Sequence, residues 1–221
     1  HFLRREKIDK IDGLLADLGV SSHQFDNAER GFSIRLEGDL DMRMNTESSL
    51  TAKDIVNNYT ESELSNILFE YGDIRNSRHI AKKIVIFRSK REITTTNDLI
   101  DALEEITPHK KRNQFLARVF QSIRIEVNDE INSLKEMLSD AIDLLSKKGR
   151  IVILSYHSIE DRLVKNLFKK GNIEGVIKKD FFGNINKPLN EINTKVIVPS
   201  LQEVINNSRS KSAKLRIAEK I

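Results

Sequence analysis

Two continuous apolar runs, each followed at once by polar residues, constrain most strongly what this chain can fold into. The first run covers residues 11–18, contains Asp17 and is followed by Gly19, and the second covers residues 151–154 and is followed by Ser155. A continuous run is typical of a strand that is buried on both faces of a parallel sheet, whereas a half-exposed strand alternates. The sequence therefore predicts two buried strands of one α/β sheet.

Helical sequence fills most of the space between these two runs. Thr51 and Thr60 are each followed three residues later by an acid, which is the pattern of a capping box at the start of a helix. Apolar residues recur with helical spacing in the later segments, and the β-branched stretch 123–127 predicts a break between two helices there. The further helical ranges that this spacing predicts are about 75–90, 97–106, 115–145 and 160–170.

The end of the chain has a different character. Residues 171–195 are rich in Asn, Gly and Lys and are interpreted as a long loop or a hairpin. A short strand is expected at 194–198, and the alternating stretch 212–218 predicts a last strand.

These patterns divide the chain into three parts. Residues 1–45 and 116–221 are interpreted as two parts of one α/β core, and residues 46–115 as an inserted helical domain. Ligands of open α/β sheets bind outside the carboxyl ends of the strands. We therefore expect the polar residues 17–22 and 155–158 to project into one crevice.

Composition excludes several kinds of function. The 221 residues include no cysteine, which excludes disulfides, thiolate zinc sites and cysteine nucleophiles and suits a reducing compartment such as the cytoplasm. The five histidines are scattered along the sequence, so no bound metal is expected. No apolar stretch is long enough to span a membrane, so no membrane is expected as a partner. The formal net charge of +4 favours an anionic partner.

One basic segment sharpens that preference. Residues 75–91 contain seven cations and no acid: Arg75, Arg78, Lys82, Lys83, Arg88, Lys90 and Arg91. A run of this kind is usually a solvated helix face. The excess of cations over acids in residues 75–91, repeated in the basic residues 109–112, favours contact with phosphate groups. The candidate contacts are Arg78, Lys82 and Lys83.

Four ordered blocks closely resemble the signature of the MraW-type methyltransferases. They are IDGLLADLGVSSHQFDNAERGFS with LDMRMN, then FQSIRIEVNDE, ILSYHSIEDRLVK and SRSKSAKLRIAEK. The resemblance implies a Rossmann-like class I methyltransferase sheet with an inserted all-helical domain. It also implies transfer of a methyl group from S-adenosylmethionine to the N4 amine of a cytosine in 16S rRNA, within the decoding region of the small ribosomal subunit.

One departure from the family pattern opens a second hypothesis. The family carries a glycine-rich turn that cradles the methionine end of the cofactor and a later acid that holds the ribose, and this sequence has no G-x-G. The sequence is therefore interpreted as a family member whose N-terminal part is missing. The second hypothesis is that the protein is an α/β module that binds RNA and does not catalyse methyl transfer.

The resemblance assigns Asp17 and Gln24 to the cofactor. Asp17 stands at the end of a predicted strand beside Gly19, where backbone can approach a ligand closely. It is also the candidate catalytic acceptor for an amine hydrogen, because positive charge develops on the nitrogen during transfer. The alternative is a turn residue whose side chain bonds the adjacent backbone.

The candidate substrate-binding residues near the two strand ends are Ser21, Ser22, Arg30, Phe32, His157 and Ser158. Ser21 and Ser22 suit either a base edge or the cap of a following helix. His157 suits either a general base or a hydrogen-bonded structural group. Phe32 suits either stacking on a base that has been flipped out of its helix or anchoring of its loop to the core.

Overall fold

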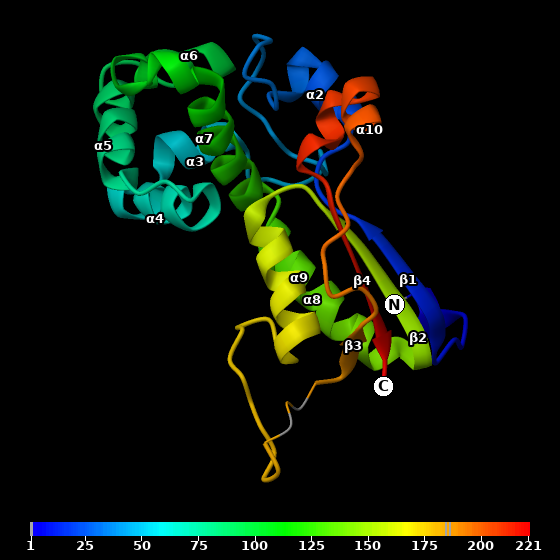
Figure 1. Cartoon of the computed structure of the whole chain (residues 1–221). Helices are drawn as coiled ribbons and strands as arrows, with labels where there is room; N and C mark the ends of the chain where they lie inside the picture. The colour runs from blue at the N-terminus through cyan, green and yellow to red at the C-terminus, as the bar shows by residue number, and fades with distance from the viewer. Residues whose placement is uncertain (1, 184, 186) are drawn as a thin grey trace. The chain divides into compact units, whose positions relative to one another are not determined.

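The computed structural model describes residues 2–183, 185 and 187–221 (Figure 1). The chain divides into two compact units. We call the first the sheet unit, which contains the residues up to Gly19 together with Ile131–Ile221, and the second the helical unit, Val20–Glu130. The chain combines a four-stranded sheet with many helices, which confirms the predicted α/β fold class.

The sheet unit contains a four-stranded sheet. Its strands are β1 (Ile11–Asp17), β2 (Leu145–Ser155), β3 (Leu189–Glu191) and β4 (Lys214–Lys220), in the spatial order β1-β2-β4-β3. The pair β1 and β2 is parallel, as predicted, and β4 is antiparallel to both of its neighbours. The structure thus confirms the three predicted strands at 11–18, 151–154 and 212–218.

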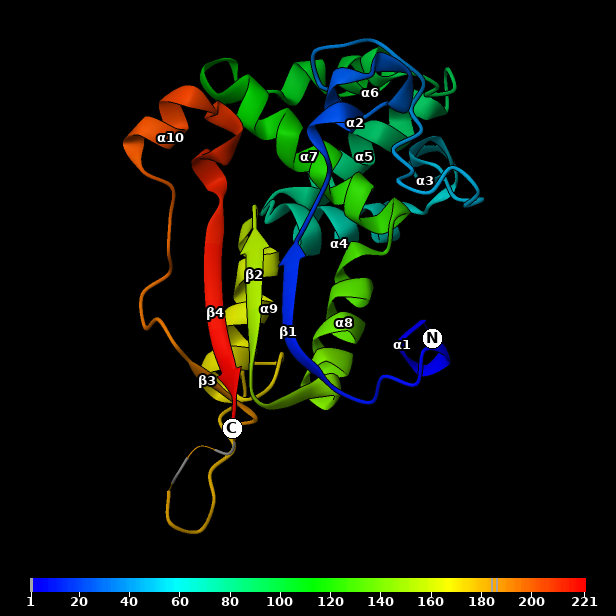
Figure 2. The ribbon, with the colours of Figure 1, turned by 90° about the vertical axis from the view of Figure 1, so that its right-hand side faces the viewer.

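The prediction that β1 is buried on both faces is wrong. The side chain of Leu15 is 71% exposed, and Gly13 and Asp17 are also exposed. The reason is that β1 is an edge strand and that α8 (Glu130–Leu144) and α9 (Ser158–Lys170) both lie behind the sheet in Figure 2. One face of the sheet therefore carries the core of this unit.

That core joins the two helices to the sheet. Leu134 and Leu138 of α8 and Val164 and Phe168 of α9 are buried in one cluster with Ile153 of β2. The acids Glu160 and Asp161 lie in the first turn of α9, and lysines lie in its last turn, as the helix dipole favours. The helix predicted at about 160–170 is confirmed.

Two expectations for the end of the chain are confirmed only in part. Residues 171–195 form a loop, but they include the short strand β3 and a single antiparallel pairing between Lys179 and Ile185. The strand expected at 194–198 is reduced to one pairing, between Ile197 and Leu215. The short helices α1 (Phe2–Arg5) and α10 (Leu201–Asn206) complete the sheet unit.

Two helices of the helical unit begin where capping boxes predict. The hydroxyl oxygens of Thr51 and Thr60 accept hydrogen bonds of 3.2 Å from the backbone N–H groups of Asp54 and Glu63. Its helices are α2 (Ser22–Asp26), α3 (Ala52–Asn58), α4 (Glu61–Gly72), α5 (Ser77–Arg88), α6 (Thr96–Leu103) and α7 (Arg112–Val127). No helix in the described part of the chain is long and apolar enough to cross a membrane.

The predicted break at 123–127 is wrong in position. Those residues continue α7, and Ile123, Ile125 and Val127 are buried. The chain leaves the helix at Asn128 and Asp129, and Asp129 has the left-handed φ of 47°. Burial of the β-branched side chains outweighs their small cost in helix propensity, which is roughly 0.5 kcal/mol per residue.

Candidate active site

In the sheet unit, β1 and β2 end together. Asp17 lies opposite Leu154, and the N–H of Leu18 donates a 3.0 Å hydrogen bond to the carbonyl of Leu154, which extends the pairing by one residue. The chain then turns at Gly19, whose φ of +90° favours glycine. Because both strands point the same way (Figure 2), the residues that follow them meet at one edge of the sheet.

The carboxylate of Asp17 is held by Tyr156, the first residue after β2. The Tyr156 hydroxyl donates a 2.8 Å hydrogen bond to Oδ1 of Asp17. Burial of the phenol, followed by its hydrogen bond to Asp17, raises the pKa of Tyr156 to about 12. The phenol is therefore protonated at neutral pH and keeps donating to the exposed Asp17 carboxylate.

Tyr156 was not among the residues that the sequence singled out. Its only signals were its place within residues 155–158, which were expected at the crevice as a group, and its place inside a block that resembles a family signature. The contact joins residues 139 positions apart, so no local pattern reveals it.

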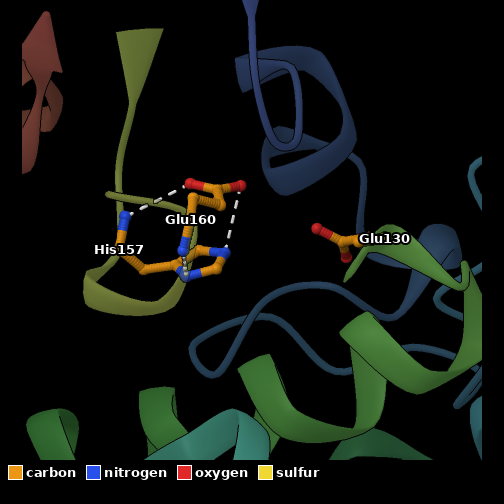
Figure 3. A group of neighbouring side chains, drawn as sticks. All are labelled: Glu130, His157 and Glu160. Atoms are coloured by element: carbon orange, nitrogen blue, oxygen red, sulfur yellow. Dashed lines mark hydrogen bonds and ion pairs between the residues drawn. The ribbon is translucent and has the colours of Figure 1, made fainter. Parts of the chain in front are cut away.

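His157 and Glu160 form a compact pair at the start of α9 (Figure 3). His157 is the N-cap residue of α9, and its Nε2 lies 3.0 Å from Oε1 of Glu160. Oε2 of Glu160 accepts from the backbone N–H groups of Tyr156 at 3.0 Å and His157 at 3.4 Å. These contacts give His157 a structural position, and its role in substrate binding, like that of the exposed Ser158, stays a prediction.

A buried ion cluster fixes α9 to β4. Asp161 accepts a 2.7 Å hydrogen bond from Nε of Arg216 and a 3.0 Å hydrogen bond from Nζ of Lys214. Burial alone would raise the pKa of Asp161, but the bonds from Arg216 and Lys214 outweigh it and hold that pKa below its usual value. The cluster fixes the first turn of α9, and with it His157 and Glu160, against the sheet.

In the helical unit, Arg30 and Phe32 hold a loop together. The Arg30 guanidinium donates to the backbone carbonyls of Arg43 and Met44. Phe32 is 3% exposed and packs edge-on against Phe25, with ring centroids 6.2 Å apart. Phe32 thus occupies an anchoring position, and a contact of either residue with substrate stays a prediction.

Asn128 is a second support of this loop that the sequence did not reveal. Its side-chain amide donates to the carbonyl of Met42 at 2.8 Å and accepts from the N–H of Met44 at 2.6 Å. Met42 has a φ of 59°, an uncommon conformation for a residue other than glycine. Bonds on both sides of Met42 hold this conformation.

The remaining candidates near the first strand lie on α2, also in the helical unit. Ser21 is the N-cap residue of α2, and its backbone N–H donates a 3.3 Å hydrogen bond to Oε1 of Gln24. Ser21 and Ser22 are exposed, and Gln24 is half-buried. Ser21 therefore stands where the capping alternative expected it, and the predicted binding roles of all three residues remain predictions.

The basic segment of α5 and the residues around it divides into two groups. Lys83 pairs with Glu105, Arg88 donates to the carbonyl of Val56 at 2.7 Å, and Arg91 pairs with Asp98. Within the described residues, the cations of this segment that are exposed to solvent and make no such ion pair or hydrogen bond are Arg75, Arg78, Lys82 and Lys90. Arg78 and Lys82 are therefore better placed for phosphate contact than Lys83.

Comparison with known proteins adds the family. The model of the MraW methylase family matches residues 1–221. The "Ribosomal RNA small subunit methyltransferase H" of Parabacteroides distasonis is 53% identical over 212 residues, which are 96% of this chain and 70% of that protein. Proteins of the same name from Bacteroides thetaiotaomicron and Flavobacterium psychrophilum are both 51% identical, over 100% and 99% of this chain and over 72% and 75% of their own lengths. The chain belongs to the MraW methylase family, a family of methyltransferases.

Proposed function

We propose that this protein transfers a methyl group from S-adenosylmethionine to the N4 amine of a cytosine in the 16S rRNA of the small ribosomal subunit, in the cytoplasm. Family membership and the names of the relatives support a ribosomal RNA substrate. The observation that carries the proposal is the exposed Asp17 carboxylate at the carboxyl end of β1, oriented by Tyr156.

The residues at this strand end fit the methyl donor. S-adenosylmethionine supplies an electrophilic methyl group on a positively charged sulfur. Asp17 offers an exposed anion. Gly19 has no side chain to keep a ligand away from the adjacent backbone. The space beside Gly19 is also open, because a Cβ added there would meet nothing nearer than Tyr156 Cδ2 at 3.8 Å. Space, negative charge and backbone access therefore coincide at the place where open α/β sheets bind ligands.

The same carboxylate suits the chemistry of the acceptor. A cytosine amine is a poor nucleophile, because its lone pair is delocalised into the ring, so it must be held in line with the methyl group. As the new bond forms, positive charge develops on the nitrogen, and an amine hydrogen needs an acceptor. The Tyr156 hydroxyl occupies Oδ1 of Asp17 and so fixes the direction in which the carboxylate accepts that hydrogen.

Replacement of Asp17 by Asn in the full-length protein is expected to slow methyl transfer at least tenfold, which corresponds to about 1.4 kcal/mol of transition-state stabilisation. The measurement is transfer of a labelled methyl group from S-adenosylmethionine to 16S rRNA. Asp12→Asn, an exposed acid earlier on the same strand, is the matched control and should keep the parent rate. A parent rate in Asp17→Asn would reduce Asp17 to a turn residue, and binding of 16S rRNA without any transfer by the parent protein would favour the non-catalytic module.

The α5 cations should contribute to RNA affinity without reading sequence. Changing Arg78 and Lys82 together to Gln is expected to weaken binding of all RNAs about equally. It should also make the slope of log affinity against log salt shallower by roughly 0.7 to 0.9 for each phosphate that is no longer neutralised. Filter binding of 16S rRNA at several salt concentrations measures both effects.

Lys83→Gln is the control for this pair of cations, because Lys83 already pairs with Glu105, and its slope should change less. An unchanged slope in the double variant would identify this surface as an ordinary solvated helix face.

A further inference from the structure

The loop that follows α9 ends in a turn that presents two phenylalanines to solvent. Phe181 is 98% exposed and Phe182 is 85% exposed. In both Figure 1 and Figure 2 this loop, drawn in gold, extends past the end of α9 and past β3. Single exposed apolar residues are common, but two adjacent, almost fully exposed aromatic rings point to a surface that contacts something else.

The turn has a defined local structure. The N–H of Phe182 donates a 2.9 Å hydrogen bond to Oδ1 of Asp180, and the N–H of Gly183 donates to the Asp180 carbonyl at 3.1 Å. Gly183 has a φ of +86°, and the pairing of Lys179 with Ile185 closes the hairpin. On this turn the two rings lie edge to face, with centroids 5.7 Å apart.

The charges next to the rings indicate what kind of partner fits. Lys178 and Lys179 directly precede the turn and are exposed. The one acid in the turn, Asp180, already accepts the hydrogen bond that shapes it. Cations beside exposed aromatic rings are the combination by which proteins hold single-stranded nucleic acid, the rings stacking on bases and the cations pairing with phosphates.

We propose that residues 178–183, which we call the aromatic tip, bind a single-stranded segment of the ribosomal RNA. Phe181 and Phe182 stack on bases, and Lys178 and Lys179 pair with phosphates. The RNA identity rests on the proposed function, whereas the stacking chemistry rests on the tip itself.

The position of the tip within the sheet unit restricts its role. β1 and β2 point away from this loop in Figure 2, so the tip lies at the end of the sheet opposite to Asp17. A base stacked on the tip is therefore not the base that is methylated. The tip anchors a distant segment of the same RNA, and its removal should raise KM and leave kcat unchanged.

A tryptophan placed at the tip tests stacking directly, because the chain contains no tryptophan of its own. In Phe182→Trp, titration with a short single-stranded oligoadenylate is expected to quench the tryptophan fluorescence saturably, and added salt should reverse the quenching. Leu201→Trp on α10 is the matched control, because Leu201 is also 85% exposed and has no flanking lysine. Absence of quenching in Phe182→Trp, or equal quenching in both variants, would overturn the proposal.

Substitutions separate stacking from simple apolar contact. Changing Phe181 and Phe182 together to Ala should weaken binding of single-stranded RNA about tenfold or more. Changing both to Tyr should preserve binding, because a tyrosine ring also stacks on bases. Changing both to Leu should weaken binding as much as the change to Ala, because leucine has no ring. Full RNA affinity in the Leu variant would show that the rings do not hold the RNA by stacking on its bases, and would overturn the proposal. Self-association in sedimentation that the Ala variant abolishes would assign the tip to a second copy of the chain.

The methyl-transfer assay distinguishes failure of this inference from failure of the proposed function. If the parent full-length protein methylates 16S rRNA and the Ala variant has an unchanged KM, the tip proposal fails and the proposed function stands. If the parent shows no methyl transfer while Phe182→Trp is quenched by RNA, the proposed function fails and the tip proposal stands.

Discussion

Replacing Asp161 by Asn is expected to lower the free energy of unfolding by about 3 kcal/mol or more, because it leaves a buried cation without its counter-charge. Arg216 is 9% exposed and donates to Asp161 at 2.7 Å. An Asn side chain keeps the shape of Asp161 but removes the negative charge that offsets the desolvation of this guanidinium. Denaturant unfolding followed by circular dichroism measures the change.

The control is a solvent-exposed ion pair on β4, the strand that carries Arg216. Glu219 pairs with Arg150 at 3.2 Å, with side-chain exposures of 36% and 63%. Glu219→Gln should cost less than about 1 kcal/mol, since exposed pairs contribute little. Equal costs for the two substitutions would contradict a special contribution from the buried cluster.

The contribution of Asp161 also has a pH dependence of known sign. The pKa of Asp161 is lower in the folded protein than in the unfolded chain. The stabilising effect of Asp161 is therefore complete at pH values above its pKa in the unfolded chain, about 3.9, and is lost as the pH falls through its pKa in the folded protein. The stability difference between the parent and Asp161→Asn should therefore be constant near neutral pH and shrink under acid conditions. A difference that grew on acidification would contradict this assignment.

Gly31→Ala is expected to lower the free energy of unfolding by about 3 kcal/mol. Backbone strain of roughly 1–3 kcal/mol and a steric clash of similar size both contribute to this loss. Gly31 has a φ of +69°, and a Cβ added there would lie 2.2 Å from the carbonyl oxygen of Asp39 and 2.8 Å from the N–H nitrogen of Asp41. Both neighbours are backbone atoms, so neither can rotate away. The measurement is thermal unfolding of the protein.

A second glycine separates the two costs. Gly183 has a φ of +86°, but a Cβ added there would meet no described atom within 4 Å. Gly183→Ala should therefore cost only the strain, about 1 kcal/mol. A cost at Gly31 no greater than at Gly183 would show that the loop around Asp39 relaxes and that the clash is not real.

Signals that act over a few residues made much of the fold predictable. The capping boxes at Thr51 and Thr60 predicted the starts of α3 and α4, because donor and acceptor lie three residues apart. The propensity of residues 123–127 did not locate the break after α7, because their burial depends on residues far away in sequence. Likewise, the apolar run of β1 did not reveal that helices cover only one face of the sheet.

The candidate active site was predictable to the same extent. Two apolar runs that end in polar residues predicted that Asp17 and the residues after β2 lie at one edge of a parallel sheet. The hydroxyl that orients Asp17 was not predictable, since Tyr156 is 139 residues away and tyrosine carries no spacing signal. The contacts of Asp161 with Lys214 and Arg216 span more than fifty residues and were missed for the same reason.

The order of the strands has a consequence for the way the protein emerges from the ribosome. The helical unit is one uninterrupted stretch, so it can fold as soon as residue 130 is free, whereas β2 must wait for β4 to pair with it. At a synthesis rate of about 5–20 residues per second, the roughly sixty residues between the two strands take about 3–12 s to translate. During that interval β2 has an unpaired edge, which is a template for wrong association. A ribosome that stalls between β2 and β4 would therefore hold a chain with a complete helical unit and an unfinished sheet.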